Sequence, residues 1–288
     1  MERILFNLPD GRQLAALRHG PNSKKLIVFF HATGSSGHAL TPDTGSLQEA
    51  GAGLLVVQRP GAGASSCFPG YGIGQVVADV RALLVAMAAE KVYLAACTGG
   101  ALFALHFAAA CPETVAGVGL ISPVLPGFPY YEQAIPGIRS SFGKMMLRTP
   151  GLDWLLVRWL AGRMQRQPER FLERWVAAGP LADRVVVEQI HKRVALLTDL
   201  REAWKRQGRA VLDEVRAMRQ ETGLCSIDMP LDIWQGTSDP GASPEIVRVL
   251  QRISRQTRMV EAPRQGRLMY LELWPAVQQH ALKILAPV

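Results

Sequence analysis

The chain has 288 residues, 48% of them hydrophobic and 19% charged, with a formal net charge of +8. This composition is typical of a globular protein with a large core and excludes a disordered chain. No apolar run approaches the roughly 20 residues of a membrane-spanning helix, and no signal peptide is recognisable at the start. We therefore expect a cytoplasmic protein without a membrane partner. The four cysteines lack paired spacing, which favours free thiols over disulfides or a zinc site, and we expect no metal or other cofactor.

The positive charge is unevenly distributed, since residues 125–225 contain 17 Lys/Arg and 11 Asp/Glu. A solvated helical surface is the simpler interpretation of such scattered charge. The alternative is a basic surface that attracts an anionic substrate or an acidic partner protein. No nucleic-acid-binding module accompanies the charge, so we expect no nucleic-acid partner.

The first part of the chain predicts strands that alternate with helices. The turn Pro9-Asp10-Gly11 indicates two strands within residues 1–18. Apolar periodicity then predicts strands at residues 25–31, 53–58, 92–96 and 115–122, with helices at 75–89 and 101–110. This alternation favours right-handed βαβ crossovers and a mostly parallel sheet.

The alternation stops after Pro123. Residues 125–225 carry Trp, Leu, Met and Arg at helical spacing with no clear strand, and we interpret them as an inserted helical cap. A strand near residues 230–236, a helix near 246–253, a strand at 257–262 and a helix at 274–285 follow. The sequence thus predicts an α/β core formed by residues 1–124 and 226–288.

The most informative motif is Ala95-Ala96-Cys97-Thr98-Gly99-Gly100, at the junction of a predicted strand and helix. Small residues around one reactive side chain are typical of a nucleophile elbow, a strained turn that raises the nucleophile above a sheet. Cys97 is the predicted nucleophile.

Blocks of residues in this order resemble the α/β-hydrolase superfamily, especially its capped esterase and proline-iminopeptidase-like members. The blocks match HGxxGS, DRPGxGxS, GxSxGG and WHGxxD, and they are His31-Ala32-Thr33-Gly34-Ser35, Gln58-Arg59-Pro60-Gly61-Ala62-Gly63-Ala64-Ser65, Ala95-Ala96-Cys97-Thr98-Gly99-Gly100 and Trp234-Gln235-Gly236-Thr237-Ser238-Asp239. The resemblance implies an α/β-hydrolase fold, with a mostly parallel central sheet flanked by helices and an inserted helical cap.

The resemblance also implies roles for individual residues. Asp239 would be the catalytic acid, and the backbone N–H groups of Thr33 and Thr98 would form the oxyanion hole. His31 and Gly99 would lie at the substrate.

The chain departs from the family where the general base is expected, because Gly266 is followed by Arg267. A thiol needs a base less than a hydroxyl does, and we expect Arg267, oriented by a bidentate ion pair with Asp239, to stabilise a Cys97 thiolate. Arginine cannot accept a proton from water or protonate a leaving amine. The leading hypothesis is therefore a cysteine-nucleophile enzyme of a biosynthetic pathway that acts on an acyl ester or thioester by acyl transfer, cyclisation or slow hydrolysis. Its small-molecule substrate could be bound to CoA or to a carrier protein.

Two other hypotheses remain open at the level of sequence. The first is a catalytically degenerate protein that keeps the pocket to bind a small molecule. The second is a non-covalent lyase or cyclase, in which Arg267 binds a substrate anion.

Overall fold

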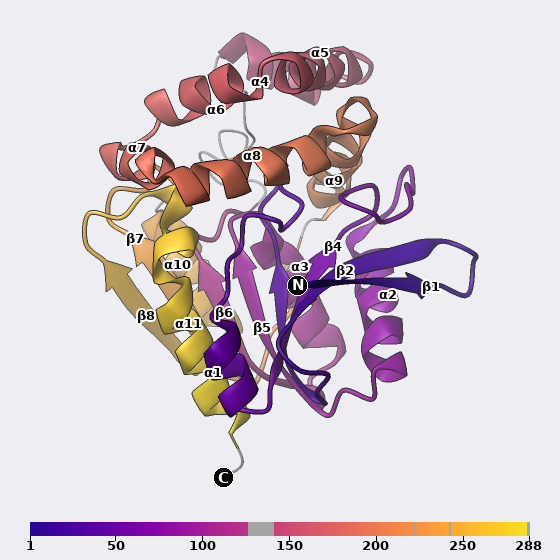
Figure 1. Cartoon of the computed structure of the whole chain (residues 1–288), viewed down its shortest axis with the longest axis vertical. Helices are drawn as coiled ribbons and strands as arrows, with labels where there is room; N and C mark the ends of the chain where they lie inside the picture. The colour runs from indigo at the N-terminus through magenta and orange to yellow at the C-terminus, as the bar shows by residue number, and fades with distance from the viewer. Residues whose placement is uncertain (126–140, 222, 242, 287–288) are drawn as a thin grey trace.

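The structure, a computed structural model, describes residues 1–125, 141–221, 223–241 and 243–286 (Figure 1). Its centre is an eight-stranded sheet with the order β1-β2-β4-β3-β5-β6-β7-β8. The β1–β2 and β2–β4 pairs are antiparallel, and the other neighbours are parallel. The strands are β1 (Glu2–Asn7), β2 (Gln13–His19), β3 (Lys25–Phe30), β4 (Gly53–Gln58), β5 (Lys91–Cys97), β6 (Val115–Ile121), β7 (Leu231–Gly236) and β8 (Thr257–Ala262).

Helices cover both faces of the sheet (Figure 1). Buried side chains of α2, α3 and α10 pack on one face, and those of α1 and α11 pack on the other. The central parallel strands are therefore continuous apolar runs, as expected where neither face meets water. These helices are α1 (Thr44–Glu49), α2 (Ile73–Ala86), α3 (Gly100–Ala110), α10 (Pro244–Ile253) and α11 (Tyr270–Leu285).

Between β6 and β7 the described residues form helices and no strand. The helices lie over the end of the sheet where β5 passes into α3 (Figure 1). Residues 126–140 and 222 of the expected cap, including Pro136-Gly137, lie outside the described residues. The helices are α4 (Ser141–Arg148), α5 (Leu152–Arg166), α6 (Pro168–Ala177), α7 (Leu181–Glu188), α8 (Ile190–Trp204) and α9 (Arg209–Gln220).

Hydrogen bonds join this group of helices, called the cap below, to the loop that follows β3. On α8, the indole N–H of Trp204 donates to the carbonyl oxygen of Gly34 at 3.2 Å. The carboxylate of Asp199 on the same helix accepts the backbone N–H of Ser36 at 3.1 Å. Since all these groups are buried, leaving one of them unpaired would cost about 1–3 kcal/mol.

The predicted fold class is confirmed, and most predicted elements agree with the observed ones to within a few residues. The largest difference is α11, which was expected to begin at about residue 274. It begins instead at Tyr270, after a 3₁₀ turn at Arg267–Met269. Tyr270, Leu271 and Trp274 are buried, which explains the early start.

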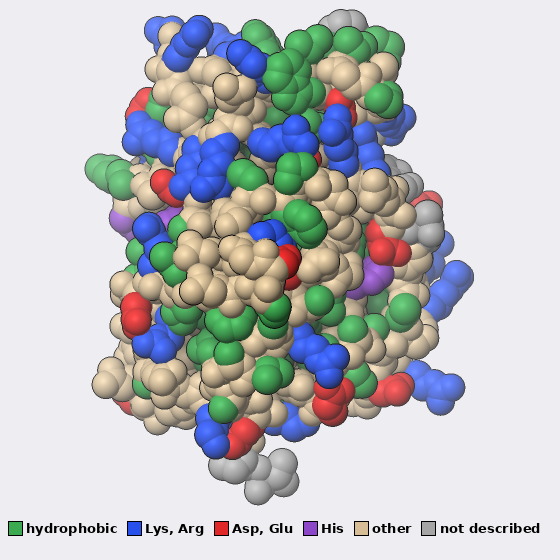
Figure 2. Space-filling model, turned by 90° about the vertical axis from the view of Figure 1, so that its right-hand side faces the viewer, with side chains coloured by type: hydrophobic (Ala, Val, Ile, Leu, Met, Phe, Trp, Pro, Cys, Tyr) green, Lys and Arg blue, Asp and Glu red, His purple; other side chains and the backbone are tan. Residues whose placement is uncertain are grey.

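Two properties of the surface are relevant to partners. In the described part of the chain, no helix is both long and apolar enough to cross a membrane. Figure 2 shows Lys and Arg side chains gathered over the cap, with hydrophobic side chains exposed between them.

Gly100 tests how closely the elbow packs. A Cβ added there would overlap the carbonyl oxygen of Phe30 and lie 2.6 Å from that of His31. We expect Gly100→Ala to lower the free energy of unfolding by about 1–3 kcal/mol, because both obstacles are backbone atoms. The measurement is urea unfolding followed by circular dichroism.

The matched control is Gly74→Ala on α2, where an added Cβ meets nothing within 4 Å. This change should leave stability unchanged or raise it by about 0.4–1 kcal/mol, since alanine restricts the unfolded chain. Equal unfolding midpoints for the two variants would contradict the close approach at Gly100.

Candidate functional site

The strained residue of the elbow is Thr98. Strand β5 ends at Cys97, α3 begins at Gly100, and Thr98 between them has φ +47°. A left-handed conformation costs an ordinary residue roughly 1–2 kcal/mol, and a β-branched side chain adds crowding. The strain therefore lies one residue after the predicted nucleophile.

Cys97 lies beneath this turn, inside the sheet-face core that also contains Tyr93 and Ala95. It is 1% exposed, and burial raises the pKa of its thiol far above the ordinary value. The strongest opposing charge is that of Arg59. The expected lowering of this pKa by Arg267 is therefore wrong, because desolvation disfavours the thiolate more than the nearby charges favour it.

The loop after β3 is held from below by the buried guanidinium of Arg59. This group donates to the carbonyl oxygens of His31 at 2.8 Å and Ala32 at 3.0 Å, and it pairs with Glu214 of α9 at 2.7 Å. It also lies over the ring of Phe103 on α3, 4.7 Å from the centroid. One side chain thus joins the loop, the elbow helix and the cap.

His31 is part of this support. Its Nδ1 lies 2.9 Å from Nη2 of Arg59 and 3.0 Å from the carbonyl oxygen of Ala32. Burial, and after it the charge of Arg59, lowers the pKa of His31 well below its ordinary value, so the imidazole is neutral. His31 was expected at the substrate, but it does not line the pocket described next.

A pocket lies between the loop, the elbow and the cap, with about 390 Å³ of empty space, part of it open to solvent. It brings together Thr33, Thr98 and Arg267 from three separate predicted motifs. All six histidines fall in the described part of the chain, and none of them lines this pocket. The lining residues are Ala32, Thr33, Gly34, Ser35, Thr98, Trp175, Leu196, Asp199, Leu200, Arg267, Leu268 and Tyr270.

The expected oxyanion hole needs a correction at Thr98. Its backbone N–H donates to the carbonyl oxygen of Ile121 at 3.0 Å and is therefore occupied within the sheet. The N–H groups of Thr33 and Gly99 have no acceptor among the described residues. Gly99 approaches Thr33 so closely that a Cβ would overlap the Thr33 hydroxyl. The two available donors thus belong to Thr33 and Gly99.

Arg267 approaches Asp239 through one pair of atoms, Nε and Oδ1, which are 3.7 Å apart. The bidentate pair that was expected is not observed. Oδ1 of Asp239 also accepts the backbone N–H of Gly241 at 2.8 Å. Asp239 is nearly fully buried at the end of β7. The acid and the arginine are therefore adjacent, but their geometry is looser than predicted.

No pattern in the sequence indicated that Asp183 of α7 contacts the turn before α11. Its carboxylate accepts the backbone N–H of Leu268 at 2.8 Å, and a Cβ on Gly266 would overlap it. Burial raises the pKa of Asp183, opposed by the Leu268 N–H and by the charge of Arg267. Arg267 accordingly lies near two buried acids, one from the core and one from the cap.

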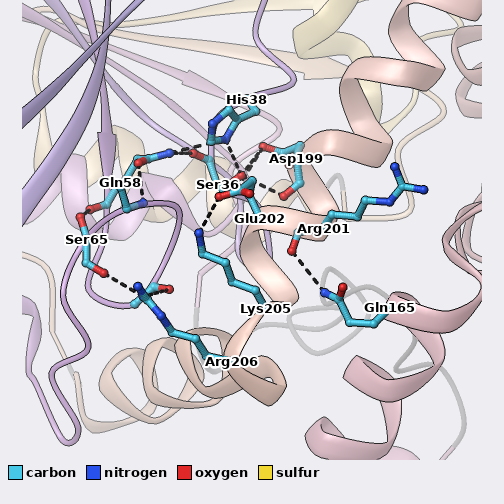
Figure 3. A network of polar contacts seen from close by, with 12 residues as sticks. Ser36, His38, Gln58, Ser65, Gln165, Asp199, Arg201, Glu202, Lys205 and Arg206 are labelled. Carbon is cyan, nitrogen blue, oxygen red and sulfur yellow. Dashed lines mark hydrogen bonds and ion pairs between the residues drawn. The ribbon is translucent and has the colours of Figure 1, made fainter.

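A second network stabilises the far side of the loop (Figure 3). Gln58 stands where the family has an acid; its amide N–H donates to the carbonyl oxygen of Ser36 at 3.1 Å. Ser36 in turn donates its N–H to Asp199, whose pKa is raised by burial. His38 contacts the Ser36 hydroxyl at 2.9 Å and is only half-buried. This network positions the loop, and among its members Asp199 lines the pocket.

No group of three or more His, Cys, Asp or Glu residues that could hold a metal ion occurs within the described ranges. The groups available for chemistry at this site include Thr98, Arg267 and the backbone N–H groups of Thr33 and Gly99.

No protein-family model and no curated protein sequence matches the chain. Solved structures do match over nearly its full length. A hydrolase from Pseudomonas aeruginosa PA01 is 20% identical, with a TM-score of 0.69 and coverage of 99% of this chain and 98% of the other. The enol-lactonase from Burkholderia xenovorans LB400 is 19% identical, with a TM-score of 0.69 and coverage of 98% and 99%.

Epoxide hydrolase A from Mycobacterium thermoresistibile is 18% identical, with a TM-score of 0.70 and coverage of 98% of each chain. These proteins are named for different chemistries on one fold, and identities this low establish the fold alone. The chain has the α/β-hydrolase fold.

Proposed function

We propose that the pocket binds a small carboxylate or acyl compound, with one of its oxygens held by the N–H groups of Thr33 and Gly99. The observation that carries the proposal is the donor set around the pocket. Thr33 and Arg267 line one cavity, which no histidine lines, and the Thr33 N–H has no acceptor among the described residues. The N–H of Gly99, which likewise has no described acceptor, directly follows the lining residue Thr98. Donors that converge where no histidine lies favour a bound anion over proton abstraction by an imidazole.

The lack of a histidine at the pocket bears directly on hydrolysis. A threonine hydroxyl is a weak nucleophile until a base takes its proton, and arginine side chains remain protonated in proteins. Thr98 with Arg267 therefore lacks the proton transfer on which serine-type hydrolysis depends. Binding, or a reaction in which charge accumulates on a bound oxygen, needs no such transfer.

Acyl chemistry is the second candidate, and the strained elbow favours it. Backbone strain is retained where the surrounding structure enforces it, often at reactive positions. In that case a bound ester or thioester carbonyl would accept the Thr33 and Gly99 N–H groups, and the nucleophile would be Thr98 or Cys97. The burial of Cys97 makes acyl transfer or cyclisation through its thiol the weaker form of this candidate.

The binding proposal predicts a dependence on Arg267. For short- and medium-chain carboxylates that bind, we expect Arg267→Gln to weaken binding about tenfold or more, because an ionised hydrogen-bond donor is lost. The corresponding primary amides should bind weakly to both forms. Isothermal titration calorimetry measures these affinities directly.

Arg264→Gln provides the control, since Arg264 is exposed on the loop that leads to Arg267. It should leave carboxylate affinity unchanged. If neither carboxylates nor acyl esters bind the unmodified protein, or if both variants lose affinity equally, the proposal is wrong.

Thiol alkylation tests the reactive state of Cys97. Cys67 and Cys225 are exposed, whereas Cys97 and Cys111 are buried. Iodoacetamide at neutral pH should therefore add two groups to the folded chain, both on exposed thiols, as read from intact mass and peptide mapping. Adduct formation at Cys97 by iodoacetamide or by an acyl thioester, abolished by Cys97→Ala, would instead support the acyl-cysteine mechanism.

The elbow assignment can be tested by restoring the family's residues. Arg267→His combined with Thr98→Ser keeps a hydroxyl at the strained position without the threonine methyl group, and it introduces an imidazole near Asp239. We expect this pair to gain hydrolysis of p-nitrophenyl acetate over the single variants. The matched pair Arg267→His with Cys97→Ser should show no gain, because residue 97 lies beneath the turn. A gain in the Cys97→Ser pair and none in the Thr98→Ser pair would show that residue 97 occupies the nucleophile position.

A further inference from the structure

One face of the cap exposes large apolar side chains that most soluble proteins would bury. Trp159 and Leu155 of α5 are 55% and 51% exposed, with Trp154 and Leu152 beside them at 36% and 37%. The opposite side of the same helix is buried against the rest of the cap. Exposed patches of this kind mark interaction sites.

Basic side chains interleave with these residues. Arg158 lies over the ring of Trp154, with its guanidinium carbon 5.0 Å from the centroid, and Arg163 lies over Trp159 at 4.8 Å. Neither arginine forms an ion pair with a described residue. We call Leu152, Trp154, Leu155, Arg158, Trp159 and Arg163 the aromatic–basic face.

The exposed charges of α4 and α5 have one sign. The acid on α4 and α5 is Asp153, which is buried and paired with Arg216 of α9 at 2.8 Å. The remaining charged residues of both helices are lysine or arginine. Figure 2 shows the same predominance of basic side chains over the cap. The complementary surface must therefore be anionic and must accept indole and leucine side chains.

We propose that the aromatic–basic face adsorbs to an anionic lipid surface. Tryptophan partitions to the boundary between headgroups and acyl chains, while long basic side chains reach the headgroup charges. Apolar contact and electrostatic attraction together retain a helix that lies along a membrane. A second copy of this chain is a poor occupant, because a two-fold contact would oppose arginines to arginines.

The pocket described above lies on another side of the cap, lined by α6 and α8. The aromatic–basic face is thus an exposed helix surface outside that pocket, along which a bilayer can lie. The expectation of no membrane partner rested on the lack of a spanning segment, and adsorption to a lipid surface needs none. This proposal does not depend on what the pocket binds.

The test is co-sedimentation of the full chain with phosphatidylcholine vesicles that contain phosphatidylglycerol, at low and high salt. We expect binding at low salt, loss at high salt, no binding to pure phosphatidylcholine, and a blue shift of tryptophan fluorescence. Trp159→Gln with Arg163→Gln should lower the partition coefficient by more than about fivefold, the effect of one basic charge at such a surface. Trp159→Tyr with Arg163→Lys should retain most of the binding.

The matched control is Arg81→Gln with Val85→Gln on α2, exposed residues at the same helical spacing and remote from the cap. Circular dichroism confirms that both pairs fold. The proposal is overturned if phosphatidylglycerol vesicles do not bind the chain, or if both pairs lose binding equally. It is also overturned if the cap pair abolishes self-association in sedimentation velocity, or polyglutamate binding, while leaving vesicle binding intact.

Discussion

The buried ion pair between Arg59 and Glu214 is the interaction on which the arrangement of the site depends. The Arg59 guanidinium also donates to the carbonyl oxygens of His31 and Ala32 and contacts Nδ1 of His31. Removing one partner of such a pair leaves an uncompensated buried charge, at a typical cost of about 3–5 kcal/mol. The loop that presents Thr33 is therefore fixed from the core side and the cap side together.

Around this fixed loop, the site combines a strained elbow turn with a guanidinium, and no histidine lines its pocket. The strained turn at Thr98, the close packing of Gly99 on Thr33 and the acid at Asp239 all survive. Arg267 stands where a general base was expected, and its guanidinium supplies charge and hydrogen bonds but takes no proton. A site of this kind stabilises negative oxygen, whether that oxygen belongs to a bound carboxylate or to a carbonyl that becomes polarised.

Most of the fold could be predicted from the sequence, because strand periodicity and the spacing of the four motif blocks reflect backbone geometry. The pattern could not decide between Cys97 and Thr98. Ala96 and Gly100 are as small as Ala95 and Gly99, so a shift of one residue satisfies the elbow equally well. The choice depends on which residue adopts φ > 0, and that depends on the N–H of Thr98 pairing with β6.

The contacts that buried acids of the cap make with the core could not be predicted from the sequence either. Asp183, Asp199 and Glu214 stand among apolar residues of predicted helices, a pattern that signals a buried acid but not its partner. The partners of these acids, Leu268, Ser36 and Arg59, lie 85, 163 and 155 residues away in the chain. Helical periodicity carries no information on pairings at that range.

The contact between Asp183 and the Leu268 N–H gives the cap a mechanical link to the arginine. Because α7 holds the turn that carries Arg267, lifting this helix away from the core would displace the guanidinium and uncap the start of α11. A ligand that requires Arg267 in place must, by reciprocity, also strengthen the seating of α7. The affinity of a ligand and the free energy of cap opening would then be two measures of one coupling.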